Sequence, residues 1–119
     1  MGFMVIDDSS TMRKIVGTAL KSGNYDYAEA ENGKDALAKL TGQKIDCFIV
    51  DFNMPEMNGI EFIKAIRQKP EYNKTPVIIL TTESDSELIE QGKSAGANAW
   101  LVKPFEKDKL LDVVGKLVV

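Results

Sequence analysis

Histidine is absent from the 119 residues of this chain. Its absence excludes Ser-His-Asp and Cys-His catalysis, zinc sites built on histidine, and chemistry through a phosphohistidine of this chain. Any chemistry that the chain performs must therefore rely on carboxylates, hydroxyl groups, lysine and a bound cation.

Cysteine is almost as scarce, since Cys47 is the single one in the sequence. One cysteine cannot form an internal disulfide, which fits a protein of the cytoplasm. Cys47 lies inside an apolar run, so we expect it to be a small buried hydrophobic residue.

Long apolar stretches are missing as well. No run approaches the roughly 20 residues that span a bilayer, and no signal peptide is visible, so we expect no membrane partner. A formal net charge of -3 argues against a nucleic-acid-binding surface. The length suits one domain with a hydrophobic core, and residues 1–119 are expected to form that domain.

Short apolar runs alternate with amphipathic stretches along the chain. The apolar runs predict strands, and the second run is more polar than the others and suits a sheet edge: 3–7, 27–31, 45–51, 76–81 and 99–103. The amphipathic stretches predict helices at 10–23, 32–42, 58–68, 84–97 and 106–119. Alternation of this kind indicates a parallel sheet with helices on both faces, a doubly wound three-layer α/β/α fold.

Local signals support these helices. In the first, the spacing predicts one buried stripe made of Met12, Ile15, Val16, Ala19 and Leu20. Gly23 is expected to end that helix, while Asn32 is a candidate N-cap for the second and Gly42 its predicted end.

Polar residues stand where the predicted strands end. Asp7 and Asp8 follow the first strand, Asp51 ends the third, Thr81 ends the fourth, and Lys103 ends the fifth. Because the carboxyl ends of parallel strands meet at one edge of a sheet, these side chains are expected to converge there.

Three neighbouring carboxylates repel one another unless a cation or a lysine offsets their charge. Oxygen ligands without histidine or thiolate suit Mg²⁺, which takes only one or two carboxylates directly. A carboxylate beside Mg²⁺ and Lys103 is suited to accept a phosphoryl group, and Thr81 is placed to hydrogen-bond it.

Each of these residues also has a simpler interpretation. Asp8 stands near a helix N-cap, Asp51 suits an Asx turn, Thr81 is an ordinary strand residue, and Lys103 is an ordinary solvated charge. Their joint placement at successive strand ends is much harder to explain in this way, and favours a site.

The segments "VIDDS" (5–9), "VDFNMPEMNG" (50–59), "ILTT" (79–82) and "KPF" (103–105) carry a family resemblance. Together they make the whole chain resemble the receiver domains of two-component response regulators, most closely the CheY-like single-domain type. The resemblance implies a flavodoxin-like sheet in the order 2-1-3-4-5, which is the known order of CheY rather than a result of the pattern above.

The resemblance also assigns roles to residues. It makes Asp51 the phosphoacceptor, and it places the metal ligands at Asp7, Asp8, Asp51 and the backbone carbonyl of Asn53. Thr81 and Lys103 would contact the phosphoryl group, and the Lys103–Pro104 peptide is expected to be cis.

Further roles concern the control of the switch. Thr81 and Trp100 occupy the switch positions, although tyrosine or phenylalanine is usual where this chain has the larger tryptophan. Asn53 and Glu83 occupy positions that tune dephosphorylation in the family. Gly59 is expected to supply a backbone conformation that other residues resist.

The implied function is signalling through partners. A histidine kinase would donate the phosphoryl group, and a downstream protein, with a flagellar motor switch as one candidate, would bind the face of residues 86–118. We expect a monomer, either a stand-alone receiver or one excised from a larger regulator.

The competing interpretation is a phosphatase of the haloacid dehalogenase type, which also forms an aspartyl-phosphate. Such an enzyme carries a second aspartate two residues after its nucleophile, whereas this chain has Asn53, which cannot shuttle a proton. It also needs a cap domain or a larger core, so the enzyme interpretation is disfavoured.

Overall fold

The computed structural model describes residues 2–55 and 57–118. Five strands and five helices alternate along them: β1 (Gly2–Ile6), α1 (Ser10–Ser22), β2 (Asp26–Ala30), α2 (Gly33–Lys39), β3 (Cys47–Val50), α3 (Gly59–Arg67), β4 (Val77–Thr81), α4 (Ser86–Ala95), β5 (Ala99–Val102) and α5 (Lys107–Leu117).

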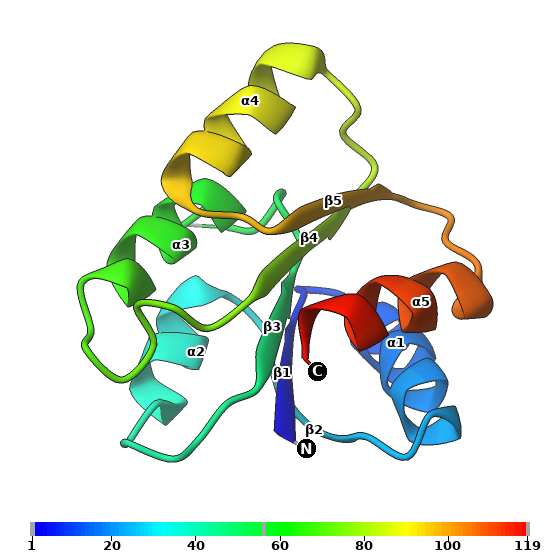
Figure 1. Ribbon diagram of the computed structural model, residues 1–119. Coiled ribbons are helices and arrows are strands. Elements are labelled where there is room, and N and C mark those ends of the chain that lie inside the picture. Colours follow the sequence, from blue (N-terminus) through cyan, green and yellow to red (C-terminus); the bar gives the residue numbers. More distant parts are fainter. Residues whose placement is uncertain (1, 56, 119) are drawn as a thin grey trace.

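All four strand pairings are parallel, and the sheet order is β2-β1-β3-β4-β5. Helices α1 and α5 cover one face of the sheet, while α2, α3 and α4 cover the other (Figure 1). The predicted doubly wound α/β fold and the 2-1-3-4-5 order are therefore confirmed. None of the described helices is long and apolar enough to cross a membrane.

The central strands are buried on both faces, because helices pack against both sides of them. Strand β2 lies at the edge, and its alternating exposure matches its polar sequence. Cys47 is fully buried in β3, and burial raises the pKa of its thiol to about 12. The expected small hydrophobic role is confirmed, because the thiol stays protonated and enclosed.

Three local predictions need correction. Ile15 was placed in the buried stripe of α1, but it is 49% exposed, because α1 buries the face of Val16, Gly17, Ala19 and Leu20 instead. Helix α2 ends at Lys39, before the predicted Gly42, although Asn32 caps its start as expected. The predicted last helix begins at Lys107, and its predicted final residue, 119, lies outside the described residues.

Gly59 is needed for a different reason from the one expected. Its φ is not among the positive values of the described residues. A Cβ there would instead lie 3.1 Å from the Asp51 carbonyl oxygen and 3.1 Å from the Phe52 Cα. The absence of a side chain thus lets α3 start directly against the backbone that follows β3.

Helix α4 is held at its C-terminal end by Arg67 of α3. The guanidinium donates hydrogen bonds to the carbonyl oxygens of Tyr72, Thr75 and Gly96, over 2.9, 2.7 and 2.7 Å. Gly96 caps α4 in the left-handed conformation (φ 116°), and a Cβ on it would lie 2.8 Å from the Arg67 Nε. Burial lowers the pKa of Arg67, a sign of how far this anchor is withdrawn from water.

We expect Gly59→Ala to lower the free energy of unfolding by about 1–3 kcal/mol, because the added methyl group presses on backbone that cannot rotate away. Gly115→Ala in α5 is the matched control, since a Cβ there meets nothing within 4 Å. It should raise the free energy of unfolding by about 0.4–1 kcal/mol. Urea unfolding measures both, and a Gly59→Ala variant as stable as the Gly115→Ala variant contradicts the steric role.

Candidate functional site

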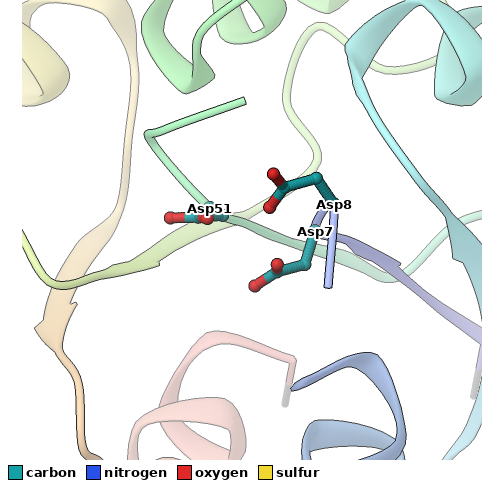
Figure 2. A group of neighbouring side chains, drawn as sticks. All are labelled: Asp7, Asp8 and Asp51. Atoms are coloured by element: carbon teal, nitrogen blue, oxygen red, sulfur yellow. The ribbon is translucent and has the colours of Figure 1, made fainter. Parts of the chain in front are cut away.

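Three aspartates meet at the carboxyl ends of two neighbouring strands. Ile6 pairs with Val50 in the register of β1 and β3, so the residues that follow, Asp7 and Asp51, lie side by side. One carboxylate oxygen from each of Asp7, Asp8 and Asp51 lies within 4.8 Å of the other two. Figure 2 shows the three side chains gathered where their strands end.

Asp7 is buried, and both of its carboxylate oxygens are engaged. Its Oδ1 accepts a hydrogen bond from the Ser9 backbone N–H over 2.9 Å, and its Oδ2 forms an ion pair with the Lys103 Nζ at 2.8 Å. Asp7 is therefore fixed in place.

Asp8 differs from its neighbour, because its side chain is exposed. No hydrogen bond or ion pair joins its carboxylate to another described residue. It is also not the N-cap of α1, since Ser9 takes that position and accepts from the Met12 N–H. The Asp8 carboxylate is thus available to a ligand.

Asp51 is 7% exposed. Its Oδ1 accepts from the Asn53 backbone N–H over 3.3 Å, which is the Asx-turn contact of the simpler interpretation, while its Oδ2 lies 3.7 Å from the Lys103 Nζ. Burial raises the pKa of the Asp51 carboxyl, Lys103 opposes that rise, and the charge of Asp7 adds to it. Asp51 thus forms the Asx turn with one carboxylate oxygen and faces the Lys103 ammonium with the other.

Lys103 joins the acidic group from the end of β5. Only 12% of its side chain is exposed, and its ammonium reaches both Asp7 and Asp51. The Lys103–Pro104 peptide bond is cis, as the resemblance implies. The simpler interpretation of Lys103 as a solvated charge is therefore wrong.

Glu83 connects the remaining predicted residues. Its carboxylate accepts from the Asn53 Nδ2 over 3.2 Å, its backbone N–H lies 3.4 Å from the Thr81 Oγ1, and its carbonyl accepts from the Trp100 Nε1 over 2.8 Å. Thr81 is fully buried, while Asn53 is exposed. Glu83 thus contacts the exposed Asn53 side chain, the buried Thr81 hydroxyl and the Trp100 indole.

Trp100 is half-buried beneath α4. Its six-membered ring lies against Gly92, where a Cβ would come within 3.0 Å of it, and its ring centroid is 6.0 Å from that of Phe52. The glycine of α4 provides room for the indole, a relation that spacing in the sequence did not reveal.

Arg13 was also missed. Its guanidinium donates to the Asp7 carbonyl oxygen over 2.6 Å and forms an ion pair with Glu29 at 2.9 Å. The available signal was an arginine one helical turn beyond the Ser9 cap, opposite a polar edge strand. The role of this arginine is evident only from the packing of α1 beside β2, because that packing brings Arg13 to Glu29.

The donor set fits a hard cation. Three carboxylates within a few ångströms create a strong negative potential, which the single ammonium of Lys103 offsets only in part. Carboxylate oxygens are ligands that Mg²⁺ prefers, and the Asp8 carboxylate is exposed to solvent at this cluster.

Comparison with known proteins shows the family. The response regulator receiver domain matches residues 3–115. The chain belongs to the response regulator receiver domain family. It is therefore a response regulator of a two-component system, and the dehalogenase-type alternative is not favoured.

Relatives cover nearly all of the chain. The chain is 42% identical to the chemotaxis protein CheY homolog of Campylobacter jejuni, over 97% of this chain and 93% of that protein. It is 40% identical to the chemotaxis protein CheY1 of Helicobacter pylori, over 97% and 98% of the two chains. The crystal structure of Vibrio cholerae chemotaxis protein CheY4 superposes with a TM-score of 0.92 at 40% identity, over 98% of this receiver and 97% of that chain.

In a metal-free buffer, Asp51→Asn should raise the free energy of unfolding of this receiver at pH 7. The raised pKa of Asp51 means that its ionised form destabilises the fold. This destabilisation is complete above the folded-state pKa and disappears as pH falls below the unfolded value, so the gain should shrink on acidification. Chemical unfolding at several pH values in EDTA measures it, and a gain that does not change with pH refutes the electrostatic origin.

Proposed function

We propose that residues 1–119 form one cytoplasmic, monomeric receiver domain of the chemotaxis type, which accepts a phosphoryl group on Asp51. The observation that carries this proposal is the difference among the three carboxylates. Asp7 is bound on both oxygens, Asp8 is free and exposed, and Asp51 is buried with an oxygen 3.7 Å from Lys103. The resemblance to chemotaxis regulators supports the pathway.

In the proposed reaction, an ionised Asp51 oxygen attacks the phosphorus of a phosphohistidine on a histidine kinase. The bond from phosphorus to the imidazole nitrogen breaks, the nitrogen keeps the electron pair and takes a proton from the solvent, and an acyl phosphate forms. Lys103 is close enough to Asp51 to offset charge on the transferred group, and the buried Thr81 hydroxyl is a second donor for it.

Mg²⁺ is the proposed cofactor. Asp8, Asp51 and the backbone carbonyl of Asn53 would hold it, with Asp7 acting through water, because the ion accepts few carboxylates directly and Asp7 is already paired with Lys103. When bound, it would supply positive charge to the transferring oxygens. The free Asp8 carboxylate supports this division of roles.

We further propose that Asn53 and Glu83 set the lifetime of the acyl phosphate. Their side chains are hydrogen-bonded to each other over 3.2 Å. This pair stands beside Asp51, since the Asn53 backbone also donates to the Asp51 carboxylate. Their combination resembles the faster class of receivers. Asn53 stands where a dehalogenase-type phosphatase has its second aspartate and cannot shuttle a proton, so the domain is a switch with intrinsic autodephosphorylation rather than a turnover enzyme.

Acetyl phosphate with Mg²⁺ should add one phosphoryl group to the protein, and intact-mass spectrometry should detect it. Asp51→Asn and removal of Mg²⁺ by EDTA should each abolish labelling, because the nucleophile or its charge compensation is lost. In the same assay, Glu83→Lys should change the rate at which the label disappears. Labelling of Asp51→Asn at the rate of the unaltered protein rules out the assignment, and an unchanged lifetime in Glu83→Lys rules out the tuning role.

The proposed output begins at Thr81. Phosphorylation adds about -1.5 to -2 charges and three acceptor oxygens. These oxygens would draw the Thr81 hydroxyl away from the Glu83 N–H, and Glu83 also holds the Trp100 indole. The signal would then pass to the face of residues 86–118, where a downstream protein, with a flagellar motor switch as a candidate, would bind.

The distance that the Trp100 side chain can move inward is limited, because the indole is already half-buried and hydrogen-bonded. The phosphoryl group shifts this equilibrium only by its difference in affinity for the two arrangements, and a change from 1:99 to 99:1 needs roughly 5.5 kcal/mol. We therefore expect a small displacement of the indole with Glu83 rather than a full rotation.

Trp100 is the single tryptophan of the chain, so its indole N–H gives one NMR signal of known origin. Beryllofluoride, which mimics the phosphoryl group, should shift this signal in the unaltered protein and leave it unshifted in Thr81→Ala. Asp51→Asn is the control for specific binding and should show no response. An equal shift with and without the Thr81 hydroxyl refutes the coupling, while the phosphoacceptor assignment survives.

A further inference from the structure

Arg13 of α1 reaches back to the segment that carries the acidic pair. Its side chain is 16% exposed, so the guanidinium is largely withdrawn from water. Nη1 donates to the Asp7 carbonyl oxygen over 2.6 Å, and Nε donates to the Glu29 Oε1 over 2.9 Å. The planar group thus joins the loop after β1 to the edge strand β2.

The Asp7 carbonyl belongs to the peptide bond between Asp7 and Asp8. Because a peptide unit is planar, fixing its oxygen also fixes the nitrogen and Cα of Asp8. Asp7 has further restraints, since its N–H donates to the Ala30 carbonyl and its carboxylate binds Ser9 and Lys103. Asp8 has no described partner for its side chain, so its backbone alone places it. Arg13 holds the peptide before Asp8, and the Ser9 N–H bound to Asp7 holds the peptide after it.

The charge of Arg13 is matched by Glu29, so the pair as a whole adds little net repulsion toward a cation at the acidic site. Geometry is the larger effect. A guanidinium directs two N–H groups at two acceptors in one plane, whereas the ammonium of lysine is a point charge without that fork. Lysine at this position would keep the charge and lose the paired contacts.

We propose that Arg13, oriented by Glu29, is a positioning residue for Asp8, and that it sets the Mg²⁺ affinity of the acidic site. The inference rests on the proposed metal site. Groups that orient metal ligands typically change metal affinity by about 10- to 100-fold when they are removed. Arg13 acts one step further away, through the backbone of its ligand, so we expect about 10-fold, the lower end of that range.

The test is a titration of the phosphate-free protein with MgCl₂ at constant ionic strength, followed by backbone amide NMR shifts. Arg13→Met and Arg13→Lys should each bind Mg²⁺ about 10-fold more weakly than the unaltered protein, and Glu29→Gln should weaken binding to a smaller extent. Lys14→Met is the matched control, because it removes the same charge from the adjacent, exposed position and should leave the affinity unchanged. Arg13→Lys and Glu29→Gln keep the test valid if Arg13→Met does not fold.

A double-mutant cycle separates positioning from general stability. Asp8→Asn alone should weaken Mg²⁺ binding, and adding Arg13→Lys to it should cause little further loss, because the ligand that Arg13 positions is already gone. Affinities of Arg13→Lys and Arg13→Met equal to that of the unaltered protein overturn the inference, and so does a full additional loss in the double variant. Failure of the unaltered protein to bind Mg²⁺ contradicts the proposed metal site instead, so the two failures are distinguishable.

Discussion

The ion pair between Lys103 and the acidic residues is the interaction on which the site depends. The sheet brings Asp7 and Asp51 together in a nearly buried position, where two negative charges are costly without a cation. Lys103 supplies that charge from β5, two strands away from β3. The ammonium lies 2.8 Å from an Asp7 oxygen and 3.7 Å from an Asp51 oxygen. It therefore neutralises the charge of Asp7 more than the charge of Asp51.

This asymmetry is the basis of the roles proposed for the three carboxylates. Asp7 is bound on both oxygens and held in place, Asp8 is exposed and suited to a cation, and Asp51 is buried beside an ammonium and suited to be a nucleophile. The proposed division of roles thus follows from differences in burial and partners rather than from the identity of the residues. Glu83 extends the arrangement, because its contacts connect the mouth of the site to the indole of Trp100.

Much of the fold could be predicted because it depends on local pattern. Buried runs such as 45–51 mark central strands, and the polar run near Tyr27 marks an edge. The convergence of Asp7, Asp51 and Lys103 followed from parallel strands alone. The strand order came from the family resemblance, since several orders satisfy the same alternation of strands and helices.

What could not be predicted depends on contacts between elements. Ile15 lies at the margin of its helical stripe, and only the packing of α1 decides that it faces water. Gly59 is required because the Asp51 backbone lies close to it. Arg13 has its role because the fold brings it to Glu29, which is 16 residues away in the sequence. Such requirements have no signature in spacing, because they arise from distances across the folded chain.

The Arg67 anchor has a mechanical consequence for helix α4. The C-terminal end of α4 is tied through Gly96 to α3 and to the loop before β4, while its only buried residue, Gly92, offers no side chain to the core. Its N-terminal end follows Glu83, which is hydrogen-bonded to Asn53 and to the Trp100 indole. The two ends of α4 are therefore held by different parts of the molecule, the C-terminal end by the Arg67 guanidinium and the N-terminal end by residues beside the acidic site. A displacement of Glu83 would act on one end of α4 while the guanidinium holds the other.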